Sequence, residues 1–268
     1  MGTHESNPLL RPFKKLLRRK KKFLSAKEAE QYRNIAVELY RDRYSLELHP
    51  LQSDPNVVPP AEVVNQVQGR SKSDVNTFLG TGYRDVVRYL DQMTENGGDV
   101  LGMQRMLDFG IGTGRISLHF LPFNIERFGC DVNPVSVEWS RKTLGDFVDV
   151  RKSEFDPPLP YDDASFDLII ANSVFTHIPY TAQPGWVEEF SRLVKPGGFV
   201  LVTIHDFNKL PESARDVGWA EKGTDRGLHN NTYLSREKLV EIWQPHFEVL
   251  DVDRNPPMQS HVVIKRSA

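Results

Sequence analysis

The feature that most constrains this chain is a run of three alternate glycines two residues after an acid: Asp108, Gly110, Gly112 and Gly114. The run joins a short apolar strand to a helix. Glycine lets the backbone turn tightly and leaves no Cβ between the backbone and a ligand. A helix N-terminus adds free N–H groups and a partial positive charge. We therefore predict that this loop binds a nucleotide-containing cofactor.

The spacing of the glycines separates the candidate cofactors. The run is Gly-x-Gly-x-Gly, whereas the dinucleotide fingerprint has its third glycine one position later, where this chain has Arg115. A second apolar segment ends at Asp131, where an acid can accept hydrogen bonds from both ribose hydroxyls. NAD and FAD would bring a pyrophosphate to the loop, whereas S-adenosylmethionine would bring an amino acid zwitterion and a sulfonium. The leading acid, Asp108, favours S-adenosylmethionine.

Further segments follow the loop in order: residues 157–161, 159–169, 173–177 and 192–198. With the glycine loop, they resemble the class I S-adenosylmethionine-dependent methyltransferases, and within these the methyltransferase type 11/12 group. Residues 159–169 are similar to the run into the family's fourth strand, and residues 192–198 to the turn before its fifth. The resemblance covers about residues 75–266. It implies methyl transfer from S-adenosylmethionine but does not identify the acceptor.

Helix and strand patterns alternate after the glycine loop, which is typical of a parallel sheet with helices on both faces. Periodicity predicts helices near 115–121, 134–144 and 184–194, and strands at 125–131, 147–151, 166–172 and 199–205. A last helix from Ser235 precedes two strands, 247–252 and 261–264, which match the antiparallel end of the family's sheet. We predict the Rossmann-like class I methyltransferase fold, an α/β fold. It has a seven-stranded, mostly parallel sheet with an antiparallel closing strand, plus a helical N-terminal extension.

The chain divides into three predicted parts: a basic, flexible arm (1–24), a helical N-terminal extension (25–100) and a catalytic domain (101–268). In the extension we predict a helix over 26–43 after a capping box at Ser25, a proline-rich linker over 49–60, and a helix over 83–95. In the catalytic domain, the connection 206–234 is about twice as long as an ordinary loop. We predict that it forms a substrate lid, because it mixes aromatic and polar residues above the cofactor cleft; a structural insertion is the alternative.

An excess of positive charge is confined to the arm. Residues 11–22 hold eight basic and no acidic side chains, whereas residues 23–268 hold 26 basic and 35 acidic ones. The arm is typical of a disordered tail; the alternatives are an amphipathic helix, residues 11–24, on an anionic membrane surface, or a nucleic-acid contact. The acidic remainder of the chain disfavours nucleic acid because it repels a phosphate backbone.

Cysteine content and hydropathy limit the protein's location. A single cysteine, Cys130, excludes an intramolecular disulfide and a multi-cysteine metal site. No apolar run reaches the length of about 20 residues that crosses a bilayer. We expect a cytoplasmic protein, peripheral to a membrane if the arm binds lipid. No metal site is evident in the sequence, although carboxylates such as Asp206 and Asp225 do not exclude one.

The predicted cofactor-binding residues lie at the ends of the first four strands: Asp108, Gly110, Gly112, Gly114, Asp131, Val132, Ser153 and Asn172. Val132 and the third-strand exit near Ser153 are expected on either side of the adenine. Tyr83 belongs to a segment, 80–83, that either contacts the methionine end of the cofactor or simply starts a helix. The other predicted substrate contacts are in the lid: Trp219, His229 and Tyr233.

An acceptor hydroxyl must lose its proton during methyl transfer, and three side chains are candidate catalytic bases: His205, Asp206 and His177. His205, next to Asp206 at the tip of the fifth strand, is favoured over His177, for which a purely structural role is the alternative. The rest of catalysis is expected to come from alignment of the acceptor with the S–CH₃ bond.

The favoured function is O-methylation of a small molecule or carbohydrate. Residues 156–159 resemble the D-P-P signature of nucleic-acid amino methylation, but they precede the fourth strand and have Leu159 at the aromatic position. The alternatives are N-methylation of a small molecule, protein or nucleic acid, a nucleotide-dependent oxidoreductase, and a non-catalytic binding module. The glycine spacing disfavours the oxidoreductase, and the intact Asp108, glycines and Asp131 disfavour the binding module.

Overall fold

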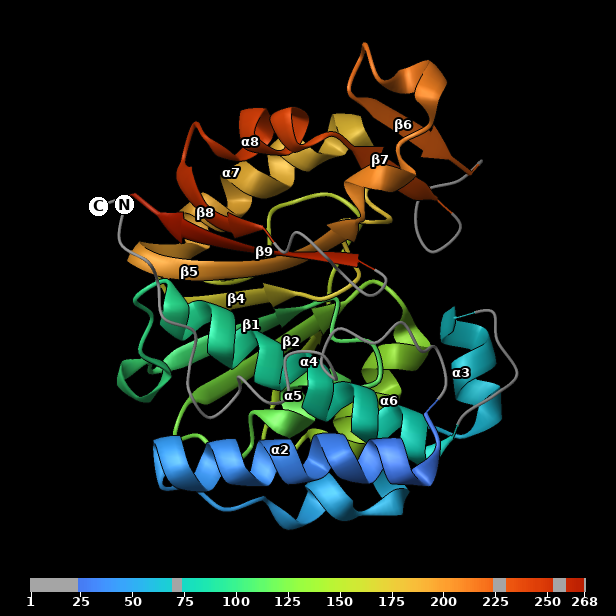
Figure 1. Ribbon diagram of the computed structural model, residues 1–268, viewed down its shortest axis with the longest axis vertical. Helices are drawn as coiled ribbons and strands as arrows, with labels where there is room; N and C mark the ends of the chain where they lie inside the picture. The colour runs from blue at the N-terminus through green and yellow to red at the C-terminus, as the bar shows by residue number, and fades with distance from the viewer. Residues whose placement is uncertain (1–23, 69–73, 224–229, 253–258, 268) are drawn as a thin grey trace.

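A computed structural model of the protein describes residues 24–68, 74–223, 230–252 and 259–267. One seven-stranded sheet, in the order β3-β2-β1-β4-β5-β9-β8, forms its centre (Figure 1). Its strands are β1 (Arg105–Phe109), β2 (Glu126–Asp131), β3 (Asp149–Lys152), β4 (Phe166–Ala171), β5 (Val194–His205), β8 (Phe247–Val252) and β9 (Gln259–Arg266). Strands β1 to β5 are parallel, and β9 runs antiparallel to both of its neighbours. The predicted fold class is confirmed.

Helices cover both faces of the sheet (Figure 1). They are α2 (Ala26–Tyr44), α3 (Ala61–Gln68), α4 (Val75–Glu95), α5 (Arg115–His119), α6 (Pro134–Leu144), α7 (Gln183–Leu193) and α8 (Arg236–Trp243). Side chains alternate between the faces of each strand. Ile170 and its neighbours pack with α2, α4 and α5, and Ile169 and its neighbours pack with α7 and α8. Because β5 is covered on both faces, residues 199–204 form a nearly continuous apolar run.

Helix α2 forms where it was predicted, and its start follows from the local sequence. The Ser25 hydroxyl accepts the N–H of Glu28, and the Glu28 carboxylate accepts the N–H of Ser25, which completes the predicted capping box. Its buried face, which includes Tyr40, contributes to the core that α4 shares with the sheet. The predicted linker contains two short 3₁₀ turns, Pro50–Ser53 and Pro55–Val57.

Helix α4 is longer than predicted. It begins at Val75 after an Asp74 cap instead of at residue 83, so residues 80–83 lie inside the helix and do not start it. Glycine weakens a helix, which is why the sequence suggested a later start. Here both glycines allow close packing: a Cβ on Gly80 would lie 2.8 Å from Leu24, and a Cβ on Gly82 would lie 2.2 Å from His119.

His119 fills the interface between α4 and α5. Its ring packs on Tyr83 with a centroid distance of 4.1 Å, and its Nδ1 lies 3.1 Å from Nε2 of Gln52. Burial lowers the pKa of His119 to about 3. The buried ring is therefore neutral at neutral pH.

We expect acid to destabilise the fold partly through His119. Its folded pKa lies below the unfolded value, so the contribution to stability is present above about pH 6.5. It is lost as the pH falls toward 3, because only the unfolded chain readily takes up the proton. Urea unfolding of wild type and His119→Gln between pH 7.5 and 4.5 measures this contribution. The variant should show the shallower pH dependence, and equal slopes would contradict the assignment.

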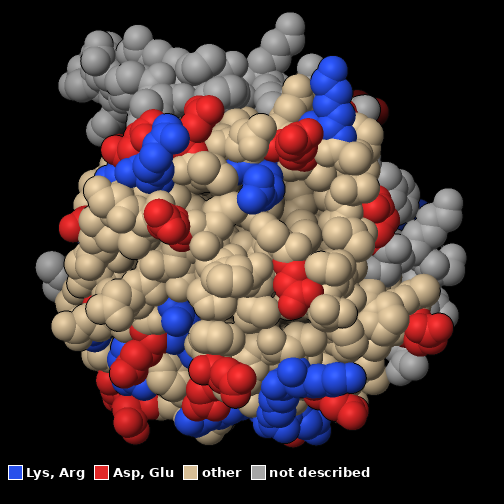
Figure 2. All heavy atoms as spheres, turned by 90° about the horizontal axis from the view of Figure 1, so that it is seen from below, with Lys and Arg blue, Asp and Glu red and all other residues tan. Residues whose placement is uncertain are grey.

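The described surface includes a face on which charges of both signs mix. Figure 2 shows this face, with lysines and arginines interspersed with acids mainly toward the rim and few charges in the middle. Among the described residues, no helix has the length and hydropathy to span a membrane. The basic arm lies almost entirely outside the described residues, so its membrane and nucleic-acid roles stay predictions.

Candidate cofactor and acceptor site

The three glycines of the loop all adopt left-handed backbone conformations, with φ of 71°, 57° and 82° for Gly110, Gly112 and Gly114. A Cβ on Gly110 would lie 2.4 Å from Val174, and one on Gly114 would lie 2.4 Å from Leu144. A Cβ on Gly112 would meet only the carbonyl oxygen of Gly110, at 3.9 Å. Gly110 and Gly114 therefore serve packing, whereas Gly112 borders open space.

Asp108 lies at the carboxyl end of β1 and is buried beneath the loop. Its Oδ2 accepts hydrogen bonds from the Ser117 N–H at 3.1 Å and the Ser117 hydroxyl at 2.7 Å. Burial raises the pKa of Asp108 to about 6, although both hydrogen bonds favour the carboxylate. The carboxyl group is thus poised to change its protonation state near neutral pH.

Asp131 ends β2 and holds the glycine loop. Its Oδ2 accepts the Gly112 N–H at 2.8 Å, and its Oδ1 accepts the Asn133 N–H at 2.8 Å. Burial raises the pKa of this carboxyl group. Ser153, just beyond β3, donates its N–H to the main-chain carbonyl of Asp131 at 3.0 Å. Val132 follows Asp131 directly, so these predicted cofactor residues lie together.

Asn172 follows β4 and is tied to α4. Its Oδ1 accepts the hydroxyl of Tyr89 at 2.7 Å. The next residue, Ser173, has a φ of 63°, which is uncommon for a residue with a side chain. Val174 then approaches Gly110. The structure therefore places all eight predicted cofactor residues at the carboxyl edge of strands β1 to β4.

The predicted lid contains an antiparallel hairpin that the sequence did not indicate. Strands β6 (Trp219–Lys222) and β7 (Asn231–Leu234) pair with each other and not with the main sheet. Trp219 stacks on Tyr180 with centroids 4.5 Å apart, and the Thr232 N–H donates to the Thr176 carbonyl at 2.9 Å. Tyr233 stacks on His205 at 4.4 Å. The hairpin is thus attached to the exits of both β4 and β5.

Consecutive asparagines of the hairpin region hold the two candidate histidines. The main-chain oxygen of Asn230 lies 2.7 Å from His177 Nδ1, and the side-chain oxygen of Asn231 lies 3.2 Å from His205 Nε2. Burial lowers the pKa of His205 to about 4, so its ring is neutral at neutral pH. The other ring nitrogen, Nδ1, is buried without a partner in the described part of the chain.

Asp206, the third candidate base, is used locally. Its Oδ1 accepts the Asn208 N–H at 3.0 Å and caps the short 3₁₀ turn Phe207–Lys209. A carboxylate engaged in this way holds the exit of β5, next to His205.

The predicted substrate contacts fall in different places. Trp219 and Tyr233 lie on the hairpin, and His229 lies outside the described residues. Tyr83 is not at the carboxyl edge: it is 1% exposed, packs in the core, and donates its hydroxyl to the Gln52 carbonyl at 2.9 Å. The prediction for Tyr83 is wrong because α4 begins eight residues earlier than expected, so Tyr83 belongs to its buried interior.

A polar network at the ends of β4, β5 and β9 was missed. Gln259 Oε1 lies 2.8 Å from the hydroxyls of both Ser173 and Thr203, and the Ser173 N–H donates to Thr203 Oγ1 at 2.7 Å. One sequence feature did point to it. Thr203 and His205 are polar residues in an otherwise apolar strand, and because they are two residues apart they lie on the same face. Nothing in the sequence indicated that Gln259 would be the cross-strand partner of His205.

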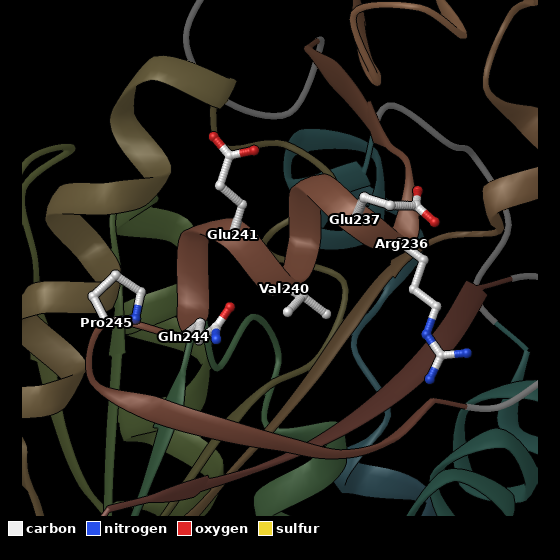
Figure 3. A pocket seen from close by; sticks show the side chains of 6 residues that line it. All are labelled: Arg236, Glu237, Val240, Glu241, Gln244 and Pro245. Carbon is white, nitrogen blue, oxygen red and sulfur yellow. The ribbon is translucent and has the colours of Figure 1, made fainter.

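Two other features lie outside this arrangement. Side chains of α8 and the residues after it line an open surface pocket (Figure 3): Arg236, Glu237, Val240, Glu241, Gln244 and Pro245. None of these is a predicted site residue. In the described ranges, no cluster of three or more His, Cys, Asp or Glu side chains could hold a metal ion.

Comparisons with known proteins agree with this geometry. A family model described as a methyltransferase domain matches residues 107–202, which span the glycine loop through β5. An uncharacterized methyltransferase from Anoxybacillus flavithermus is 22% identical over 174 residues, or 61% of this chain and 78% of the relative.

Solved structures share the fold. An S-adenosylmethionine-dependent methyltransferase from Clostridium acetobutylicum superposes with a TM-score of 0.53 at 14% identity, over 67% of this chain and 89% of that one. A putative sarcosine dimethylglycine methyltransferase from Galdieria sulphuraria gives 0.55 at 14% identity, over 87% and 98%. These two likenesses show the fold that the chain shares with the solved structures. The methyltransferase domain matched by residues 107–202, together with the sheet order, indicates an enzyme that uses S-adenosylmethionine as methyl donor.

Proposed function

We propose that this enzyme methylates a hydroxyl group of a small molecule or carbohydrate. The observation that carries the proposal is the pair of histidines, His177 and His205, held by the hairpin at the exits of β4 and β5. A hydroxyl must lose a proton when it is methylated, and a positioned imidazole can accept that proton. Orientation of the acceptor by the surrounding polar side chains supplies the rest of the rate enhancement.

We also propose that the edge of β1 to β4 binds the donor. The residues fit it: the face of Gly112 is open, so the backbone can approach a ligand there. Each carboxylate oxygen of Asp131 accepts one backbone N–H and keeps a second lone pair for a ribose hydroxyl. Asp108 supplies negative charge next to the methionine end, Val132 and Ser153 border the adenine, and Asn172 lies nearest the acceptor. When bound, the donor supplies an electrophilic methyl group.

The binding of the cationic donor should depend on pH through Asp108. With a pKa of about 6, about a tenth of this carboxyl group is ionised at pH 5 and nearly all of it at pH 7.5. If the carboxylate is the form that binds, affinity for S-adenosylmethionine should rise about tenfold between these values. Calorimetry of wild type and Asp108→Asn checks this. A wild-type affinity that is flat with pH, or an equal rise in the variant, would contradict the role of Asp108.

Methyl transfer from ¹³C-methyl-labelled S-adenosylmethionine tests the function directly. The probes are catechol and methyl α-glucopyranoside as hydroxyl acceptors, and glycine and sarcosine as amine acceptors. NMR of the products distinguishes O-methyl from N-methyl carbons. Labelled O-methyl product supports the proposal. Transfer to the amines alone would replace it with N-methylation.

A further inference from the structure

The orientation of the His177 ring is fixed by a group that can only accept. The main-chain oxygen of Asn230 lies 2.7 Å from Nδ1, and a carbonyl oxygen has no hydrogen to donate, so Nδ1 carries the proton. In the neutral ring, Nε2 then has a free lone pair. Nε2 has no hydrogen-bond partner among the described residues, and the side chain is only partly buried.

The orientation of the Gln259 amide is fixed by two groups that donate, in contrast to the acceptor that orients His177. Thr203 Oγ1 accepts the Ser173 N–H and donates its own hydrogen to Gln259 Oε1 at 2.8 Å. The Ser173 hydroxyl donates to the same oxygen at 2.8 Å. Both hydroxyls therefore hold the oxygen end, and the NH₂ group of Gln259 points away from them. It has no partner in the described part of the chain, and the side chain is partly exposed.

One turn links His177 to the partner that holds Gln259. Ser173 begins it, and the His177 N–H closes it on the Val174 carbonyl at 2.8 Å. Val174 in turn lies against the first glycine of the cofactor loop. The left-handed φ of Ser173 is a strained conformation that the surrounding hydrogen bonds maintain, and such strain tends to occur at functional sites. The turn therefore connects the cofactor loop to both His177 and Gln259.

We propose that His177 and Gln259 form the subsite for the acceptor hydroxyl, with His177 as the catalytic base and Gln259 as the residue that holds the acceptor oxygen. This inference rests on the proposed O-methylation. A hydroxyl group donates one hydrogen bond and accepts others, so it matches a lone pair on Nε2 and an NH₂ donor at the same time. An ammonium group would face the Gln259 donor, and a carboxylate or phosphate would face the Nε2 lone pair. The subsite therefore selects neutral alcohols or phenols.

The chemical step is balanced by these residues and the donor. An oxygen lone pair of the acceptor forms the O–CH₃ bond while the S–CH₃ bond breaks, and the bonding pair stays on sulfur. The hydroxyl proton moves to His177 Nε2, giving an imidazolium that then releases it to water. His205, whose pKa burial lowers to about 4, stays neutral and stacks on Tyr233 beside this step.

The tautomer of His177 can be measured without an acceptor. In ¹⁵N-histidine-labelled protein bound to S-adenosylhomocysteine, the two ring nitrogens of a neutral imidazole give distinct signals. His177→Gln identifies the His177 signals, and His246→Gln, at an exposed site after α8, is the matched control. We expect the proton on Nδ1. A proton on Nε2 of the neutral ring overturns the inference.

Variants test the step itself with the hydroxyl probes catechol and methyl α-glucopyranoside. His177→Gln should lower kcat by about 10²- to 10⁴-fold while the affinity for S-adenosylhomocysteine stays within about twofold. Gln259→Glu keeps the acceptor oxygen but loses the NH₂ donor, so it should raise KM for the probe about tenfold or more, roughly the value of one hydrogen bond. Wild-type kcat in His177→Gln overturns the inference and leaves O-methylation standing.

Gln183→Met separates contact with the acceptor from support of the turn. Gln183 is buried and donates from Nε2 to the carbonyls of Phe175 and Ile178, so it holds the same segment by another route. The Gln183→Met variant should lower the free energy of unfolding without raising KM. If Gln183→Met raises KM as much as Gln259→Glu does, then disorder of the turn explains both effects and the inference fails. If wild type transfers methyl only to amines, the proposed function fails too.

Discussion

Replacing Gly112 with alanine should weaken binding of S-adenosylhomocysteine by roughly five- to a hundredfold, because fitting an extra methyl group against a closely packed ligand costs about 1–3 kcal/mol. The new Cβ would enter the open space that we propose the donor occupies. The cost to folding should be only about 1–2 kcal/mol, since the left-handed φ of 57° is unfavourable for alanine but no neighbour is displaced. Calorimetry and urea unfolding of the same variant measure the two effects separately.

Gly110→Ala and Gly114→Ala are the matched controls. Their φ values are similar, but each new methyl group would lie 2.4 Å from a side chain, Val174 or Leu144. These variants should lose more stability than Gly112→Ala, by about 1–3 kcal/mol of overpacking. Val174→Ala should recover part of the loss in Gly110→Ala, because it removes the clash. If all three glycine variants lose the same stability and the same affinity, the division between packing and ligand approach is wrong.

Asp131→Ala should reduce the affinity for S-adenosylhomocysteine by roughly a hundredfold or more. Hydrogen bonds to a charged group contribute about 1.5–3 kcal/mol each, and the variant loses both proposed ribose contacts. The loop should also loosen, because the Gly112 and Asn133 N–H groups lose their acceptor.

Asp131→Asn and Asp162→Ala make this measurement specific. Asparagine keeps one acceptor oxygen without the charge, so the affinity of Asp131→Asn should lie between those of wild type and Asp131→Ala. Asp162 is exposed in the connection before β4 and should bind the ligand as wild type does. An unchanged affinity in Asp131→Ala, with the fold intact by circular dichroism, would exclude Asp131 from the cofactor site.

The fold was predictable where sequence pattern and packing agree locally. The helix 134–144 was predicted at its observed bounds because Asn133 caps it and Pro134 starts it. The glycine loop was equally clear, since each of its glycines adopts a positive φ. These features depend on residues close in the sequence, so a single chain is enough to identify them.

The missed features depend on contacts between distant segments. The early start of α4 is stabilised where Gly82 lets the helix approach His119, which no local pattern reveals. The hairpin in the predicted lid is short, and a main-chain hydrogen bond from Thr232 ties it to Thr176 in the turn after β4. Gln259 lies near the proposed acceptor subsite only because β9 pairs antiparallel with β5, which sets it opposite His205. Composition and periodicity carry no information about such pairings.

The contact between His177 and Asn230 also has a consequence for sequence divergence. The group that orients the imidazole is a main-chain carbonyl, which every amino acid possesses. Substitutions in the hairpin can therefore change the surface that we propose faces the acceptor while the ring keeps its tautomer, provided that the backbone path is kept. An engineer could vary the hairpin side chains to change substrate preference and leave the proposed proton acceptor untouched.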